Sequence, residues 1–380
     1  MDAVPSPRRI RSLAPLETAL AALAPRLAPV VPERVPLAGA AGFVLAEPLS
    51  PPGPCPPWPV ASRDGYAVPA DAALGAAPSS PVFFPERPAA VEAGERMPAG
   101  ADAVLPPEAV EEIAGLVEVT GSAARGDGVR ERGYDAEEYA PILPAGVRLA
   151  PLALAAARAC GIDFAAVRRP SARIVTTGDG EGPEAAADLI AAHAARAGLS
   201  LAARRHVPDD PDAIAAAVAD AAVDLVVTIG GTGLGTTDRT VDGVARAAEV
   251  LAHGVALSPG ETAAIAAAPD MAVLMLPGRL DAALAAWLAL GRPIAARLAG
   301  AREAPPPPLL PLARKVVSTI GMTEIVFVVL ADGRLEPLGG AGLPLGRLAR
   351  ADGFVTVPPN LEGYQAGALV AFEALAGAAP

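Results

Sequence analysis

Hydrophobic positions near the start of the chain follow a helical period. Five leucines recur every three or four residues and so share one face of a helix: Leu13, Leu16, Leu20, Leu23 and Leu27. Pro25 should kink or end that helix. A second helical segment is predicted from about Pro151 to Cys160. Residues 46–135 between them are rich in Pro and Gly and carry short β-type runs, PVFF and GLVEVT. We therefore expect a β-rich insertion between two helical pieces of one module.

From Arg169 onward, strand-like and helix-like segments alternate. Strands are expected at 172–176, 199–206, 224–229 and 271–276, and helices at 185–197, after 209–211 and at 280–298. Asp209 or Asp210 suits a helix N-cap, and Pro211 suits the first helical turn. Alternation of this kind predicts a doubly wound parallel sheet.

The last part of the chain follows a strand period. Prolines 305–308 form a stiff extended linker, and beyond them apolar and polar residues alternate. Asp332-Gly333 is a plausible hairpin turn. The expected fold class is α/β plus β in several domains: 1–45 with 136–168 as a helical and linker domain, 46–135 as an inserted β-rich domain, 169–303 as an α/β domain and 304–380 as a small β domain.

Composition narrows the functional classes. A net charge of −12 argues against a nucleic-acid binder, since phosphate contacts need clustered basic residues. Cys55 and Cys160 are not spaced like metal ligands. Because the chain has only three histidines, a zinc site built from His is not expected either. No apolar stretch has the length of a membrane span. The sequence therefore predicts a soluble, cytoplasmic protein.

The segment 228–240, TIGGTGLGTTDRT, is the strongest local signal. A Gly-rich turn after a buried strand lets backbone N–H groups approach an anion, helped by the N-terminus of the next helix. The alternative is a loop whose glycines only allow tight packing of strand and helix. Two further turns, TTGD at 176–179 and DDP at 209–211, should end at the same sheet edge and favour a ligand site there.

Several motifs together resemble the molybdopterin molybdenumtransferases, whose relatives include the E domain of gephyrin. The resemblance covers nearly the whole chain. It rests on the order and spacing of SRDGYAV at 62–68, GERMPAGADAV at 94–104, VRERGYD at 129–135, LPAGVRLAP at 143–151, RRPSARIVTTGD at 168–179, GGTGLGTTD at 230–238, LPG at 276–278 and ARADGFVTVPP at 349–359.

The resemblance implies insertion of molybdate into adenylated molybdopterin with hydrolysis of the adenylate, aided by Mg²⁺ or a similar cation. It also implies a homodimer with its site between the α/β domain of one subunit and the insertion of the other. Motif positions match functional residues at Asp64, Arg130, Asp135, Asp209 and Asp238. We expect the cation at Asp209, Asp238 and Glu181, and the pterin at Thr177, Gly178, Asp179, Gly230, Gly231, Thr232, Gly233, Ser258, Pro277, Gly278 and Arg279. Carboxylates around an anionic substrate need a divalent metal to neutralise the charge.

The chain departs from the family pattern at several positions. Lysines are expected at three positions that here carry Gly254, Ser258 and Glu261. Gly180 stands in place of an expected glutamate, and neighbouring Glu181 can take over its role. Ala93 replaces a threonine, and LPGRLD at 276–281 replaces an asparagine turn. If a phosphate-bearing pterin still binds, we expect Arg130, Arg239 or Arg279 to supply the missing positive charge.

Three functions stay open at this point. The first is the molybdenumtransferase reaction. The second is a carrier that holds molybdopterin or the finished cofactor for a target molybdoenzyme without turnover. The third is activity like that of the molybdopterin adenylyltransferases, which share the α/β fold and could also be partners. The family's four-module architecture speaks against the third.

Overall fold

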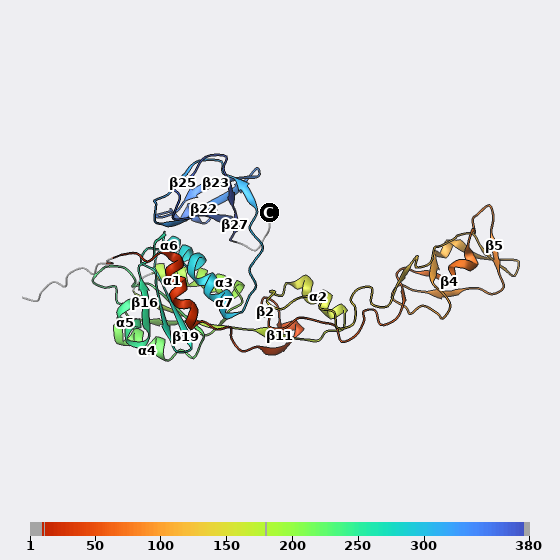
Figure 1. The fold of residues 1–380 in the computed structure, drawn as a ribbon, viewed down its shortest axis with the longest axis horizontal. Helices are drawn as coiled ribbons and strands as arrows, with labels where there is room; N and C mark the ends of the chain where they lie inside the picture. Colours follow the sequence, from red (N-terminus) through yellow and green to blue (C-terminus); the bar gives the residue numbers. More distant parts are fainter. Residues whose placement is uncertain (1–9, 11, 179–180, 376–380) are drawn as a thin grey trace, which may run out of the picture.

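The computed structural model describes the chain except for residues 1–9, 11, 179–180 and 376–380. The molecule is elongated: an α/β layer and a β module lie at one end, and a strand-rich insertion lies at the other (Figure 1). None of the described helices is long and apolar enough to cross a membrane.

A seven-stranded mixed sheet forms the centre of the α/β layer. Its strands are β12 (Ser171–Thr177), β13 (Ser200–Leu201), β14 (Arg205–Val207), β15 (Leu225–Ile229), β16 (Glu249–His253), β18 (Ala264–Ala268) and β19 (Met271–Leu276). The order is β13-β12-β15-β19-β18-β16, with β14 also paired to β12. The expected parallel pairing is confirmed for β12 to β15 and its neighbours. Strands β16 and β18 extend the sheet in antiparallel fashion. The sequence pattern missed them because the alanines of β18 give no alternation of polar and apolar residues.

The segment expected as one strand at 199–206 is split into two short edge strands. Both β13 and β14 pair with β12, and residues 202–204 between them leave the ladder. The Arg204 guanidinium there contacts the carboxylates of Glu184 at 3.1 Å and Asp188 at 2.6 Å.

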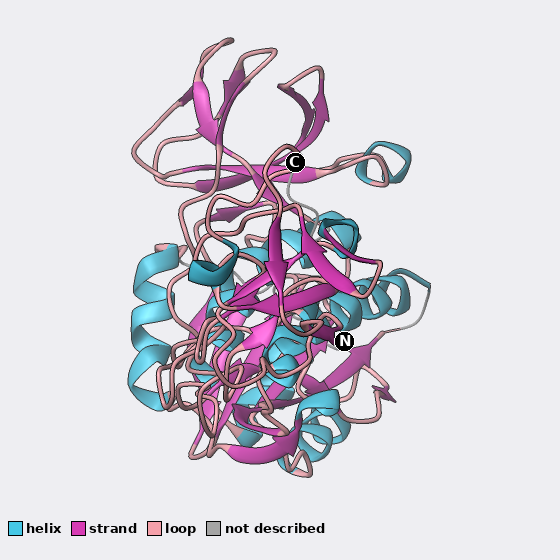
Figure 2. Ribbon diagram, turned by 90° about the vertical axis from the view of Figure 1, so that its right-hand side faces the viewer, coloured by secondary structure: helices cyan, strands magenta, loops and turns pink. Residues whose placement is uncertain are grey.

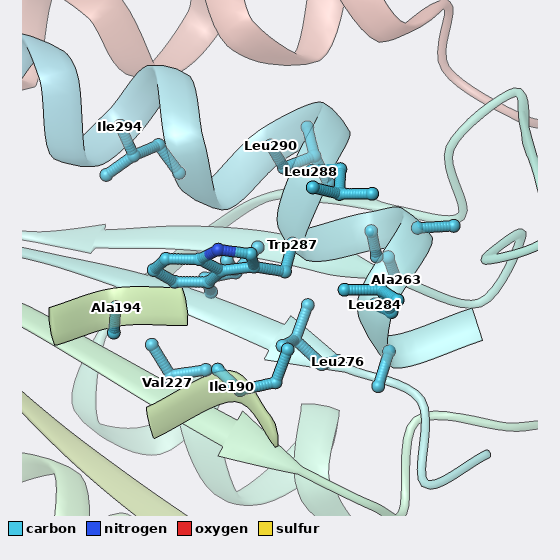
Figure 3. Packing of buried hydrophobic residues seen from close by; sticks show 14 of the residues in the cluster. Ile190, Ala194, Val227, Ala263, Leu276, Leu284, Trp287, Leu288, Leu290 and Ile294 are labelled. Atoms are coloured by element: carbon cyan, nitrogen blue, oxygen red, sulfur yellow. The ribbon is translucent and has the colours of Figure 1, made fainter. Parts of the chain in front are cut away.

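Helices cover both faces of the sheet, as Figure 2 shows. One face carries α1 (Leu16–Leu23), α3 (Glu181–Arg196), α6 (Leu280–Ala286), a π-helical turn (Trp287–Gly291) and α7 (Arg292–Leu298); the other carries α4 (Pro211–Ala219) and α5 (Thr240–Ala247). Trp287 is fully buried in the first of these cores, beside Ala194 of α3, Leu276 of β19 and Ile294 of α7 (Figure 3). The layer is therefore doubly wound, as predicted.

The first helix differs from expectation in its partner. Helix α1 ends at Leu23, and Pro25 lies in the 3₁₀ turn (Ala24–Arg26) that follows, as predicted. Its buried residues Ala19 and Leu23 belong to the core of the α/β layer. Helix α2 (Pro151–Ala159) instead packs in a separate core with a three-stranded sheet. The two helices therefore do not pack together as the pieces of one helical module.

The linking module is built on that three-stranded sheet. Strands β1 (Glu33–Pro36), β11 (Phe164–Arg168) and β2 (Val44–Leu45) pair antiparallel in this order, and a 3₁₀ turn (Leu37–Gly39) follows β1. The module connects the α/β layer to the insertion (Figure 1).

The insertion contains only short strands. They are β3 (Val60–Ala61), β4 (Gly65–Val68), β5 (Val82–Phe84), β6 (Ala89–Val91), β7 (Ala103–Leu105), β8 (Val110–Ile113), β9 (Leu116–Val119) and β10 (Val129–Arg130), with 3₁₀ turns at Ala70–Ala73 and Pro107–Ala109. They form the sheets β6-β4-β7 and β5-β9-β8 and the pair β10-β3. The runs PVFF and GLVEVT become β5 and β9, which pair with each other, so the predicted β-rich insertion is confirmed.

The C-terminal module is a small β domain, as expected. It contains β20 (Leu309–Pro311), β21 (Val316–Val317), β22 (Thr323–Ala331), β23 (Arg334–Gly339), α8 (Leu345–Leu348), β24 (Gly353–Val357), β25 (Gly363–Tyr364), β26 (Leu369–Ala371) and β27 (Glu373–Ala374). Asp332 and Gly333 join β22 to β23 with φ of 49° and 70°, the positive values of a type I′ hairpin turn. Strand β17 (Leu257–Ser258) from the α/β segment adds to this sheet, parallel to β22.

Candidate functional site

Four strand-to-helix turns meet at the carboxyl edge of the parallel strands. A Cβ built on Gly231, after β15, would lie 3.1 Å from Oγ1 of Thr177, the last residue of β12, and 3.3 Å from Oδ1 of Asp209, after β14. The fourth turn follows β19, where a Cβ on Gly278 would lie 3.5 Å from Cα of Gly230. The prediction that GGTG and TTGD lie at the same end of the sheet is therefore confirmed.

Glycine is required at the tightest point of this edge. Gly230 and Gly231 have φ of +103° and +61°, which side chains rarely adopt, and a Cβ on Gly230 would approach the Thr177 carbonyl oxygen to 2.5 Å. The buried Thr240 hydroxyl donates to the Gly230 carbonyl oxygen at 2.8 Å and lies 3.0 Å from the Thr177 hydroxyl. Thr240 therefore ties the glycine turn to the end of β12, and sequence reasoning gave it no role.

Two candidate carboxylates lie against this Gly-rich turn. Asp209 borders Gly178 and Gly231, and Asp238 Oδ2 would lie 2.7 Å from a Cβ on Gly233. Asp238 also accepts a hydrogen bond from the Gly235 backbone at 2.7 Å, which folds its side chain over the loop. The helix cap is supplied by Asp210, whose carboxylate accepts from the Ala213 N–H at 2.8 Å. The N-cap of α4 is therefore Asp210, whereas Asp209 lies against the Gly-rich turn.

The third expected metal ligand cannot be placed. Asp179 lies outside the described residues, and so does the side chain of Glu181. Across the part of the chain that the structure describes, no group of three or more ligating side chains is arranged to hold a metal ion. Asp209 and Asp238 nonetheless fit Mg²⁺, which in proteins often takes one or two carboxylates, with substrate phosphate oxygens and water completing its shell.

The segment expected to carry lysines contacts the Gly-rich turn through a hydroxyl group and an imidazole ring. The Thr262 hydroxyl lies 3.1 Å from the Thr232 hydroxyl, and His253 Nε2 lies 3.1 Å from the Thr232 carbonyl oxygen. Ser258 lies on β17, where it pairs with Glu324 of the C-terminal sheet. In this segment Thr262 and His253, rather than Ser258, make the observed contacts with Thr232.

The arginines expected to replace the lysines are ion-paired within the chain. Arg239 Nη1 lies 3.7 Å from the Asp242 carboxylate. Arg279, after Pro277 and Gly278, donates to both oxygens of buried Asp281, at 3.2 and 2.5 Å. Asp281 also accepts from the Gly342 N–H at 2.9 Å and so connects this turn to the C-terminal module. Both guanidinium groups remain partly exposed, so a phosphate can still approach them.

A hydrogen-bonded network behind the first turn was not predicted. The buried Thr176 hydroxyl donates to Glu184 of α3 at 2.5 Å and lies 3.1 Å from His206 Nδ1. The Thr176 hydrogen bond and the nearby Arg204 hold the pKa of Glu184 below its usual value, although burial opposes this shift. The network connects the ends of β12 and β14 with the first turns of α3.

The remaining candidates gather on the insertion and its connection. Asp64 accepts from the Ala93 N–H at 2.8 Å, and Arg130 on β10 pairs with Asp135 at 3.1 Å. Arg130 and Asp135 line a cavity of about 990 Å³ together with residues that the sequence pattern did not single out, among them Trp58, Cys55 and Cys160. Trp58 is 44% exposed, and the Arg96 guanidinium lies 4.9 Å from the centre of its ring.

These two groups of candidates are far apart within one chain. Strand β4, which follows Asp64, lies at the end of the molecule opposite the α/β sheet (Figure 1). The structure therefore brings together the turn residues with Asp209 and Asp238, and separately Arg130 with Asp135, but it does not join the two groups.

Family models match three consecutive parts of the chain. The MoeA N-terminal region (domains I and II) matches residues 14–161, a probable molybdopterin binding domain matches residues 171–297, and the MoeA C-terminal region (domain IV) matches residues 310–375. Together they leave only the termini and two short connections unmatched.

Individual relatives agree with these matches. A molybdopterin molybdenumtransferase of Synechococcus elongatus is 28% identical over 65% of this chain and 70% of its own length. A putative molybdopterin biosynthesis protein of Methanocaldococcus jannaschii is 26% identical over 95% of this chain and 98% of its own.

Solved structures show the same architecture. The molybdopterin biosynthesis MoeA protein of Pyrococcus horikoshii superimposes with a TM-score of 0.75 at 22% identity, covering 95% of this chain and 99% of that one. A second MoeA crystal structure from the same genus gives a TM-score of 0.73 at 27% identity, covering 96% and 100%. With the order of its domains, its fold and its motifs in agreement, the chain belongs to the MoeA family.

Proposed function

We propose that this protein inserts molybdate into adenylated molybdopterin and releases AMP. The observation that carries the proposal is the meeting of four strand-to-helix turns with Asp209 and Asp238 at one sheet edge. Glycine turns before helices present backbone N–H groups that suit phosphate oxygens. The match of all three family regions supports the same reaction.

Within the proposed site, the residues have separate tasks. The turns at Gly178, Gly231 and Gly278 bind the pterin and its phosphates, and Thr240 keeps the Gly231 turn in position. Asp209 and Asp238 would hold Mg²⁺, which would neutralise phosphate charge when bound. A water molecule attacks the phosphoanhydride, which separates AMP from the phosphate of the pterin. The two dithiolene sulfurs then bond to the molybdenum of molybdate, and their two protons leave with one oxo oxygen as water.

We further propose a homodimer in which the insertion of one subunit completes the site of the other. The separation of Asp64, Arg130 and Asp135 from the sheet edge within one chain supports this arrangement (Figure 1). Trp58 would add an exposed ring beside Arg130 and Asp135, suited to stacking on a planar heterocycle. The cytoplasm is the proposed location, and a molybdopterin adenylyltransferase or a target molybdoenzyme is the proposed partner.

One observation favours the alternative function of a carrier. Arg130, Arg239 and Arg279 already have carboxylate partners, and the expected lysines are absent. Because a phosphate must compete with these carboxylates, the site offers less free positive charge for stabilising a leaving phosphate. A carrier that binds the finished cofactor does not need that stabilisation.

Turnover and binding measured together distinguish the two functions. Purified protein is incubated with adenylated molybdopterin, molybdate and Mg²⁺, AMP is quantified by chromatography, and pterin binding is followed by calorimetry. AMP release above the rate without protein supports the transferase, and saturable binding without AMP supports the carrier. Absence of both would refute the two proposals together.

Single arginine variants test how charge is supplied. Replacing Arg130, Arg239 or Arg279 with Ala should weaken pterin binding by about 1.5–3 kcal/mol wherever that arginine contacts the phosphate. Arg205→Ala provides a matched control. Arg205 lies on the edge strand β14 and forms an ion pair with Asp220. Unchanged binding in all three site variants would show that backbone N–H groups alone hold the phosphate.

A further inference from the structure

A second cavity, of about 870 Å³, lies between the α/β layer, the C-terminal module and the segment that connects them. Its walls come from the last turn of α3, from α7, from strands β22 and β24, and from residues 301–305. None of the candidate site residues lines it. His193 lies twelve residues after Glu181, the start of α3, so the rise of the helix places this cavity about 18 Å from the end of the helix that follows the Gly178 turn.

The charged residues that line this cavity are mostly cationic. They are Arg148, Arg196, Arg292 and Arg302, against Glu303 and Glu373. This is a surplus of two positive charges in a chain whose net charge is −12. Such a local concentration of guanidinium groups attracts anions.

Three of the four guanidinium groups have no carboxylate partner among the described residues. Arg292 pairs with Glu373 at 3.0 Å. Arg148 and Arg196 donate only to backbone carbonyl oxygens, those of Gly42 and Leu375. For Arg302 no ion pair is observed within the described ranges, and its aliphatic stem packs on Gly146. The cavity therefore has donors available for a further acceptor.

Two groups that line the cavity have lowered pKa values, chiefly because they are buried. Burial lowers the pKa of Arg148. Burial, together with the charges of Arg196 and Arg292, also lowers the pKa of His193, so this imidazole is neutral at pH 7. The charged groups that line the cavity around His193 are the four arginines and two glutamates already named.

Apart from the hydroxyls of Thr323 and Thr356, most of the remaining cavity wall is apolar. Leu16, Leu288, Ile325 and Phe354 contribute to it, and the Arg292 guanidinium lies 5.8 Å from the centre of the Phe354 ring. Apolar walls favour burial of a hydrocarbon or aromatic body, whereas guanidinium groups favour bidentate contact with phosphate. The two features together select a ligand that has both parts.

We propose that this cavity binds a small organic phosphate, with the dianionic group among Arg148, Arg196 and Arg302 and an apolar body against Phe354 and Ile325. The site is separate from the four turns and does not depend on the proposed function. It lies where three modules meet, so an occupied cavity connects the C-terminal module to the α/β layer.

The three histidines of the chain allow a direct test. His193 lines this cavity, whereas His253 contacts Thr232 and His206 borders Thr176 at the four turns. Proton NMR of the imidazoles, with assignments from single His→Gln variants, follows titration with inorganic phosphate, phenyl phosphate and phenol. We expect phenyl phosphate to shift His193 saturably and to raise its pKa, with His206 and His253 unmoved. Phosphate should bind more weakly and phenol should not bind.

Arginine variants link the signal to the cavity. Arg196→Gln and Arg302→Gln should each weaken phenyl phosphate binding roughly tenfold or more, as expected for loss of a charged hydrogen bond. Arg302→Lys should retain part of the affinity, and Arg205→Gln, outside the cavity, should retain all of it. Shifts at His206 and His253 alone would place the binding at the four turns. That result, equal binding by phenol, or unchanged affinity in both Gln variants would overturn the proposal.

Discussion

The adjacent residues Asp209 and Asp210 have different roles, one in the candidate site and the other in capping a helix. Asp210 caps α4 through the Ala213 N–H, whereas Asp209 lies against Gly178 and Gly231. Asp210→Ala should lower the free energy of unfolding by about 1 kcal/mol, the usual worth of an N-cap, and leave turnover unchanged. Asp209→Asn should reduce AMP release roughly a hundredfold or more, since charge stabilisation by a held metal is worth several kcal/mol.

Urea unfolding and the AMP assay measure both quantities on the same preparations. Asp212→Asn, in the first turn of the same exposed helix end, serves as a control for general effects of charge. If Asp210→Ala abolished turnover while Asp209→Asn left it intact, the roles assigned to the two residues would be reversed.

The Cys160 thiol should ionise at a higher pH than an ordinary cysteine. Burial and the hydrogen bond with Cys55 raise the pKa of Cys160 to about 11 from 9.0. A raised pKa means that the folded state holds the proton more tightly, so this contribution to stability is complete below pH 9 and is lost as the pH rises toward 11. The alkylation rate of Cys160 by iodoacetamide should therefore keep rising above pH 9.

Mass spectrometry of the modified peptide gives that rate separately from the rate of Cys55. In Cys55→Ala the hydrogen bond is lost, so the rate should level off at lower pH than in the unmodified protein. Plateaus at the same pH in both proteins would show that Cys55 does not raise the pKa of Cys160.

At the scale of elements, the turn between β15 and α5 depends on glycine. Gly231→Ala would place a methyl group against the Thr240 hydroxyl at a φ of +61°. We expect a loss of about 1–3 kcal/mol in stability from the strained backbone, and weaker pterin binding because the turn must move. Thermal unfolding and calorimetry measure the two effects.

For stability alone, Gly235→Ala is the matched control for this substitution, since Gly235 lies in the same loop without a positive φ. Its Cβ would meet the Asp238 carboxylate rather than Thr240. Equal stability of the Gly231 and Gly235 variants would argue against a special requirement at position 231.

Local patterns were sufficient to predict most elements of the α/β layer and the hairpin at Asp332-Gly333. The buried strands ending at Thr177 and Ile229 are apolar runs followed by Gly-containing turns, and both features are visible in the sequence. Packing partners were not visible: the leucine face of α1 is equally compatible with any apolar surface, and the structure shows that it packs on the α/β sheet. The alanines of β18 likewise leave helix and strand undecided.

For the candidate site, too, local patterns could be predicted from the sequence and contacts between distant segments could not. Residues in turns after strands, such as Gly231 and Asp209, could be assigned to one edge because parallel strands end together. Thr240, Thr262 and Trp58 were missed because their roles depend on contacts between segments distant in sequence. The ion pair of Arg279 with Asp281 also involves Gly342, sixty-one residues further along the chain, which no local pattern indicates.

At the scale of the whole molecule, the insertion lies far from the sheet edge, so the number of subunits decides whether residues from both can share a site. Strand β4, which follows Asp64, and helix α5, which follows Asp238, lie at opposite ends of the molecule (Figure 1). A site that needs both aspartates must therefore draw on two subunits. In the proposed homodimer, each of the two sites takes Asp64 from one subunit and Asp238 from its partner. A dimer in which each subunit carries a different substitution therefore has one intact site and one doubly altered site.

This geometry predicts complementation between two inactive variants. Asp64→Asn and Asp238→Asn should each lose AMP release alone. After the two are mixed, dissociated in mild denaturant and reassociated, random pairing makes half of the dimers mixed, and activity should recover to about a quarter of the wild-type value. The control is Asp209→Asn mixed with Asp238→Asn, where both changes lie on the same side of the site and mixed dimers retain no intact site. Light scattering confirms that the reassociated protein is dimeric. Equal recovery in the control, or a monomer at micromolar concentration with full activity, would contradict the shared site.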